Sequence, residues 1–208
     1  MKTRVKMCGI TRLVDAQAAI EAGVDALGFV FYPPSPRYIE PEKAAEIIAQ
    51  IPAFINCVGL FVNEQDKTIE NILIQTQLDL IQFHGDESHE FCKQFSRPFI
   101  KAIRMKDEQN IQHSIEQYPT AKGILLDSYV KGVPGGTGEI FNWDKIPDNL
   151  TKPIILAGGL SANNIAQAIK QVNPYAVDVS GGIEAHPGVK SDDKINEFMR
   201  QVYLTKLI

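Results

Sequence analysis

Cysteine is scarce in this 208-residue sequence, and the few that occur lie far apart. They stand at positions 8, 57 and 92, and no C-x-x-C pair is present. An odd number of widely spaced thiols does not build a disulfide framework, and it is typical of proteins that keep their thiols reduced. The four histidines form no H-x-x-x-H pair. We therefore expect neither a disulfide-stapled fold nor a zinc site. Because the thiols are expected to be reduced, we also expect a cytoplasmic location.

The sequence also lacks long apolar runs and an excess of positive charge. No stretch of about 18 apolar residues occurs, so no membrane span is predicted. Basic residues at positions 2, 4 and 6, with no apolar segment behind them, do not predict a signal peptide. A formal net charge of −4 argues against nucleic acid as the main partner. It is compatible with a phosphorylated small molecule, because local dipoles dominate the binding of phosphate.

One pattern repeats along the whole chain: an apolar run, a break rich in glycine, proline or polar residues, and an amphipathic segment. Strands are expected at 4–8, 26–31, 55–62, 80–84, 99–103, 123–127, 153–157 and 176–180. Helices are expected at 13–22, 41–50, 64–75, 87–95, 107–117, 161–171 and 191–203. Such alternation, with nearly continuous apolar strands, is typical of a parallel sheet covered on both faces.

Eight such repeats in roughly 200 residues close best as a compact (β/α)8 TIM barrel, which we expect to be a single domain over 1–208. An open, doubly wound sheet is the alternative. No G-x-G-x-x-G follows the first expected strand, which lowers that alternative.

Polar side chains share one face in four of the expected strands, because side chains alternate along a strand. In a barrel this face is the interior or the mouth, so the strand ends are expected to form a site. We also predict that Lys6 and Asp178 pair inside the barrel. Taken singly, each polar group is compatible with a structural role, which is the favoured interpretation of Gln82. The polar positions are Lys6 and Cys8, Gln82 and His84, Asp127, and Asp178 and Ser180.

Glycines follow the last two expected strands, as Gly158-Gly159 and as Ser180-Gly181-Gly182. Glycine lets backbone N–H groups approach an anion, and a helix that starts nearby adds positive potential. The loops after strands seven and eight are the usual phosphate position in such barrels. The sequence therefore predicts a phosphate site there, with plain turns as the alternative.

Cys8 and Asp127 suggest acid–base chemistry. Near Lys6 and helix N-termini, the Cys8 thiol would be partly ionised and could accept a proton, although an inert buried cysteine is the commoner case. Asp127 follows three large apolar residues and could keep a proton long enough to donate it. An acid and a base facing each other across the barrel mouth suit an isomerisation that needs no cofactor.

Two loops add further hypotheses. Arg37 ends a proline-stiffened loop, where a guanidinium group suits a planar carboxylate. A structural ion pair is the alternative for this residue. The segment 131–138, KGVPGGTG, lacks the order of a P-loop, and it is predicted to be either a lid over the mouth or an ordinary surface loop.

Nine motifs in this order resemble those of the phosphoribosylanthranilate isomerase family, over the whole chain. They are KMCGIT (6–11), DALGFVF (25–31), SPRYI (35–39), VGLFVN (58–63), QFHGDE (82–87), LLDS (125–128), GGTG (135–138), LAGGL (156–160) and VDVSGGIE (177–184). The resemblance implies a (β/α)8 barrel that acts in tryptophan biosynthesis without a cofactor. The implied reaction is an Amadori rearrangement of N-(5-phospho-β-D-ribosyl)anthranilate to 1-(2-carboxyphenylamino)-1-deoxy-D-ribulose 5-phosphate.

The resemblance also implies roles for single residues. Cys8 would be the general base at ribose C2, and Asp127 the general acid on the ring oxygen. Arg37 would hold the anthranilate carboxylate, and His84 would lie at the mouth with a role left open. The phosphate would lie on the last two loops, where Gly181 stands at a position that is commonly serine in the family. The members are monomers or homodimers. The phosphate residues are Gly158, Gly159, Ser180, Gly181 and Gly182.

Other phosphosugar barrels and a non-catalytic phosphate-binding barrel are the competing hypotheses. A ribulose-phosphate epimerase would need histidine and aspartate metal ligands at strand ends. The isomerase of the histidine pathway would carry an aspartate where Cys8 stands. A barrel that only binds phosphate would have no use for Cys8 and Asp127 at paired strand ends.

Overall fold

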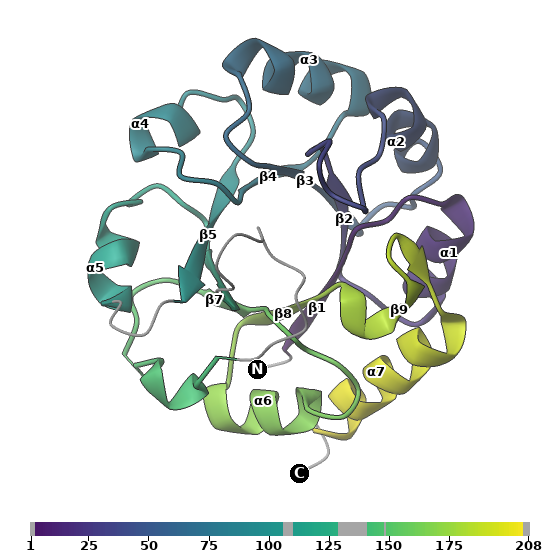
Figure 1. The fold of residues 1–208 in the computed structure, drawn as a ribbon, viewed down its shortest axis with the longest axis vertical. Coiled ribbons are helices and arrows are strands. Elements are labelled where there is room, and N and C mark those ends of the chain that lie inside the picture. The colour runs from purple at the N-terminus through teal and green to yellow at the C-terminus, as the bar shows by residue number, and fades with distance from the viewer. Residues whose placement is uncertain (1–2, 106–109, 129–140, 148, 206–208) are drawn as a thin grey trace.

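The computed structural model describes residues 3–105, 110–128, 141–147 and 149–205, and its centre is a closed parallel barrel of eight strands (Figure 1). The strands follow chain order around the barrel, and β8 pairs with β1 to close it. The predicted (β/α)8 barrel is confirmed, and the open sheet is excluded. The strands are β1 (Arg4–Cys8), β2 (Ala26–Val30), β3 (Asn56–Phe61), β4 (Leu80–Phe83), β5 (Phe99–Met105), β6 (Ile124–Ser128), β7 (Ile154–Leu156) and β8 (Ala176–Val179).

Helices form a ring around the barrel in Figure 1. Within the described residues, none is long and apolar enough to cross a membrane. The connection between β6 and β7 contains a short 3-10 helix, η1 (Trp143–Lys145), and the segment 131–138 lies outside the described residues. The helices are α1 (Leu13–Glu21), α2 (Pro41–Ile48), α3 (Asp66–Thr76), α4 (His89–Cys92), α5 (Ile111–Glu116), α6 (Ile165–Val172) and α7 (Asp192–Leu204).

α6 and α4 begin later than predicted, for local reasons. α6 begins at Ile165 and not at Ser161, because the Asn164 side chain accepts from the Ser161 N–H and donates to the carbonyl of Gly159, which holds a turn before the helix. α4 is a single turn that starts after Ser88, whose hydroxyl caps it by accepting from the Phe91 N–H.

Apolar side chains fill two layers of the barrel. The larger lies between strands and helices, where Phe29, Phe61 and Phe83 are fully buried. The smaller consists of alternate residues on the other face of the later strands, including Ile100, Leu125 and Ile155. On their strands these residues precede the polar groups, so the packed interior leaves the carboxyl ends for the site.

A feature that the sequence did not predict follows β8. The 3-10 helix η2 (Gly181–Ile183) leads into a small antiparallel hairpin of β9 (Glu184–His186) and β10 (Val189–Lys190). Its turn residue Gly188 has a φ of +83°, and a Cβ there would lie 2.9 Å from the carbonyl oxygen of Pro36. The hairpin therefore packs against the loop that carries Arg37.

Candidate active site

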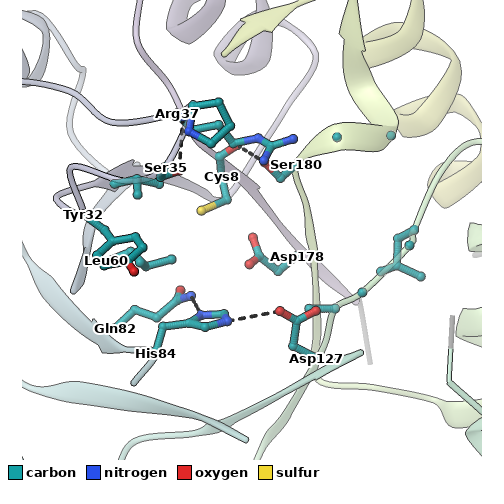
Figure 2. Close-up of a pocket in the computed structure, with 18 of the residues that line it drawn as sticks. Cys8, Tyr32, Ser35, Arg37, Leu60, Gln82, His84, Asp127, Asp178 and Ser180 are labelled. Carbon is teal, nitrogen blue, oxygen red and sulfur yellow. Dashed lines mark hydrogen bonds and ion pairs between the residues drawn. The ribbon is translucent and has the colours of Figure 1, made fainter. Parts of the chain in front are cut away.

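A cavity of about 580 Å³ lies at the carboxyl ends of the barrel strands, and all nine residues predicted for the site line it. They come from six of the eight strand ends, and Figure 2 shows Cys8 and Asp127 reaching toward it from different sides. The nine are Cys8, Arg37, His84, Asp127, Gly158, Gly159, Ser180, Gly181 and Gly182.

Buried charges surround Cys8. Lys6 Nζ lies 2.9 Å from Asp178 Oδ1, which confirms the predicted pair between neighbouring strands. Gly28 leaves room for this group, because a Cβ there would lie 2.8 Å from Cys8 Sγ and 3.0 Å from Lys6 Nζ. Burial raises the pKa of the Cys8 thiol, and the opposing effect of Lys6 is smaller. The expectation of a partly ionised thiol is therefore wrong, because desolvation outweighs the nearby cation.

The Cys8 backbone is held by a lysine that the sequence did not point to. Lys190 Nζ donates to the carbonyl oxygen of Cys8 at 2.6 Å, and Ser180 Oγ donates to the same oxygen at 3.0 Å. Lys190 also forms an ion pair of 2.8 Å with Glu184. Burial lowers the pKa of Lys190, although Glu184 opposes this. The β9–β10 hairpin thus fixes the end of β1.

Arg37 lines the cavity and is paired with a carboxylate of the protein. Its Nε and Nη2 donate to the two oxygens of Glu184 at 2.8 and 2.7 Å. Burial tends to raise the pKa of Glu184, but Arg37 and Lys190 outweigh it and hold that pKa below its usual range. Ser35 Oγ accepts from the Arg37 backbone N–H, which stiffens the loop. The structural ion pair foreseen as an alternative is present, and the carboxylate-binding role stays a prediction.

Asp127 belongs to a chain of three buried side chains. His84 Nε2 lies 3.1 Å from Asp127 Oδ2, and His84 Nδ1 lies 2.9 Å from Gln82 Nε2 (Figure 2). The sequence predicted that these residues share a side of the barrel, but it did not predict that they touch.

The glycine loops present free backbone donors. Gly158 and Gly159 have φ values of +81° and +64°. Gly182 touches the preceding loop so closely that a Cβ would lie 2.0 Å from the carbonyl oxygen of Leu160. No hydrogen bond within the described ranges uses the N–H groups of Gly159, Gly181 or Gly182. Since α6 begins a turn later than predicted, the loop amides lie nearer the cavity than the helix N-terminus does.

No cluster of three or more histidine, cysteine, aspartate or glutamate side chains that could hold a metal occurs in the described part of the chain. A closed (β/α)8 barrel with a thiol, a histidine-paired carboxyl group and free amides in its last two loops defines the class of phosphosugar isomerases that work by acid–base chemistry.

Comparisons identify the family. The family model described as N-(5'phosphoribosyl)anthranilate (PRA) isomerase matches residues 5–201, and the chain belongs to this family of cofactor-independent isomerases of tryptophan biosynthesis. The N-(5'-phosphoribosyl)anthranilate isomerase of Pseudomonas putida (strain GB-1) is 55% identical over 199 residues, which are 96% of this chain and 97% of the relative.

Solved structures of the same family also match the chain. The phosphoribosylanthranilate isomerase of Thermotoga maritima has a TM-score of 0.89 and 39% identity, and the match covers 97% of this chain and 98% of that one. A second isomerase structure, in complex with reduced 1-(o-carboxyphenylamino)-1-deoxyribulose 5-phosphate, has a TM-score of 0.86 and 38% identity, with coverage of 97% and 98%.

Proposed function

We propose that this barrel isomerises N-(5'-phosphoribosyl)anthranilate, with Asp127 as general acid and Cys8 as general base. The observation that carries the assignment is that one cavity holds a carboxyl group from β6, a thiol from β1 and three free backbone amides. A carboxyl and a thiol group are sufficient for two proton transfers.

The substrate has two anionic ends, and the cavity offers a partner for each. The phosphate would lie on the backbone N–H groups of Gly158, Gly159, Gly181 and Gly182 beside Ser180. The carboxylate would bind Arg37 at Nη1, which the pair with Glu184 leaves unused among the described contacts. Binding at both ends would hold the ribose between Cys8 and Asp127.

The chemistry follows from these positions. Asp127 gives a proton to the ring oxygen, the C1–O bond breaks, and the nitrogen lone pair forms a C=N bond. The iminium group makes the C2 proton acidic, and Cys8, acting from its minor thiolate form, removes it to give an enolamine. The enol hydroxyl proton then moves to C1, which yields the ketone. One proton enters and one leaves the substrate, so the reaction is an isomerisation, and exchange with solvent resets Cys8 and Asp127.

An activity assay tests this proposal directly. The purified chain should abolish the anthranilate-type fluorescence of the substrate on turnover, and its gene should rescue a tryptophan auxotroph that lacks the isomerase. Binding of phosphate compounds without turnover would indicate a non-catalytic barrel. Turnover of the histidine-pathway substrate alone would favour the competing isomerase.

We also propose that 1–208 act as one unit in the cytoplasm, as a monomer or a homodimer. The Thermotoga maritima relative is described as a dimer from which monomers have been generated. Phe54, with a positive φ of 75° and 98% of its surface exposed, is the apolar side chain in the described ranges that would gain most from a second copy. Light scattering of the wild type and of Phe54→Ser tests this.

A further inference from the structure

Gln82 has one end of its amide engaged and the other free. The residue is fully buried on β4 and lines the cavity. Its Nε2 lies 2.9 Å from His84 Nδ1, whereas Oε1 has no hydrogen-bond partner in the part of the chain that the structure describes. Leaving a buried polar atom unpaired costs about 1–3 kcal/mol. What sets Gln82 apart is the place of its engaged end, which lies in the cavity against the histidine that contacts Asp127.

The backbone of His84 is held independently of Gln82. Its N–H donates to the carbonyl oxygen of Phe61 at 2.8 Å. Its carbonyl oxygen accepts from Arg104 Nη2 at 2.9 Å. The ring lies between Gln82 and Asp127, and the open question is which ring nitrogen carries the proton.

The amide of Gln82 determines which ring nitrogen of His84 carries the proton. With Gln82 Nε2 as the donor to His84 Nδ1, this ring nitrogen accepts and carries no proton. The proton of a neutral imidazole is then on Nε2, which donates to Asp127 Oδ2 across 3.1 Å. An oxygen that accepts this bond is a poor place for a second proton, so a proton that Asp127 carries for transfer is directed to Oδ1. Within the described residues, Oδ1 has no hydrogen bond, and Asp127 lines the cavity.

We propose that Gln82 is a positioning residue for the general acid, acting through the tautomer of His84. It keeps the imidazole proton on Nε2, so that the transferable proton of Asp127 lies on Oδ1 and the carboxylate left after transfer is stabilised at Oδ2. The inference rests on the proposed role of Asp127 as the acid.

The opposite tautomer of His84 would hinder proton transfer from Asp127 to the substrate. With the proton on Nδ1, the lone pair of Nε2 would face Asp127 and accept the carboxyl proton, which would draw it away from the substrate. Control of a histidine tautomer by a neighbouring group is worth up to about 10⁴-fold in kcat in serine proteases. Because the His84 backbone remains held here, we expect a smaller loss.

Gln82→Met is the variant that tests the proposal, since it keeps the length of the side chain and removes the donor. We expect kcat to fall about 10- to 100-fold with KM changed less than about threefold, because catalysis and not binding is affected. Long-range ¹H–¹⁵N correlation spectra of the labelled protein, with His84 assigned by His84→Gln, should show Nε2 protonated in the wild type. In Gln82→Met this preference should disappear, and in Gln82→Glu the proton should move to Nδ1.

Gln112 on α5 supplies the matched control. It is also a glutamine with an unpaired buried Oε1, and its Nε2 bonds Glu116 away from the cavity. Gln112→Met should leave kcat and the His84 spectrum unchanged, and thermal melting should show both methionine variants folded. A protonated Nδ1 in the wild type, or a Gln82→Met enzyme with normal kcat and an unchanged spectrum, would overturn the inference. Normal kcat in Asp127→Asn would instead refute the proposed function, whatever the His84 tautomer.

Discussion

The two sides of the cavity surround Cys8 and Asp127 with different kinds of partner. On the base side, Cys8 lies beside two buried pairs of ionisable groups, Lys6 with Asp178 and Lys190 with Glu184. On the acid side, the partners of Asp127 are an imidazole and, behind it, an amide. A cation beside a thiol favours the thiolate and opposes the effect of burial, whereas the amide behind His84 brings no charge to the acid side. The two sides therefore differ in the kind of partner that each holds.

The sides also differ in how the chain builds them. Gln82 lies on β4 with His84 directly after this strand, and Asp127 lies on β6, two strands further along the barrel. The base side joins the two ends of the chain, because Lys190 donates to the Cys8 carbonyl from 182 residues away. The base side therefore depends on barrel closure and on the hairpin, and the acid side depends on local register.

Removing either reacting group should have the largest effect. Cys8→Ala and Asp127→Ala should each lower kcat by about 10²- to 10⁴-fold, because each removes one proton transfer. A ligand such as the reduced product analogue should still bind, since the phosphate and carboxylate partners remain. Steady-state kinetics and equilibrium titration measure the two quantities. Near-normal kcat in either variant would show that the substituted residue does not transfer a proton on its side of the cavity.

The ion pairs of the base side should govern stability. Glu184→Leu leaves Arg37 and Lys190 without their carboxylate partner, and the free energy of unfolding should fall by about 3–5 kcal/mol, as measured by denaturant titration. Glu197→Ala removes a carboxylate that pairs with Arg200 on the surface of α7 and should change the free energy of unfolding far less, because solvent screens this pair.

The sign of the pH dependence follows from Glu184. Its pKa lies below the ordinary value, so its contribution to stability is present above the pKa of the unfolded chain and is lost as pH falls through the folded pKa. Glu184→Leu should remove this part of the acid sensitivity. Equal losses of unfolding free energy in the Glu184 and Glu197 variants would contradict a buried ion-pair network on the base side.

The placement of Cys8 and Asp127 in one cavity was predictable from the sequence. Both end apolar runs, and parallel strands that close into a barrel bring their carboxyl ends to one mouth. The pair of Lys6 and Asp178 was predictable for the same reason, since closure makes the first and last strands neighbours.

The surroundings of these residues were not predictable. Arg37 and Glu184 are 147 residues apart, and the hairpin that carries Lys190 has strands too short to leave a periodic pattern. The protonation of Cys8 was predicted wrongly because it depends on depth of burial against distance to Lys6, and a sequence contains neither quantity. The late start of α6 depends on an asparagine side chain that replaces a turn of helix.

The glycine loops after β7 and β8, proposed to hold the phosphate, join the two sides of the cavity. Gly182→Ala would force a Cβ against the carbonyl oxygen of Leu160, so the loops must separate, and we expect KM to rise about 10- to 100-fold for a strain of about 1–3 kcal/mol. Gly181→Ala places its Cβ 3.2 Å from Arg37 Nη2, a tight contact that a small shift relieves, and should change KM less. Competition by inorganic phosphate should weaken in parallel with KM. Similar KM values in both variants would place the phosphate elsewhere.

The pH dependence of Cys8 alkylation should give the smallest and most graded effect. Burial raises the pKa of this thiol above the ordinary 9.0, and only the thiolate reacts, so iodoacetamide should modify Cys8 slowly at neutral pH. The rate should rise about tenfold per pH unit until it levels off above pH 9. Peptide mass spectrometry separates Cys8 from Cys57 and Cys92, whose pKa values of about 12 keep them unreactive as internal controls. A rate that levels off well below pH 9 would mean that Lys6 outweighs burial, and that the base side keeps its thiolate ready before substrate binds.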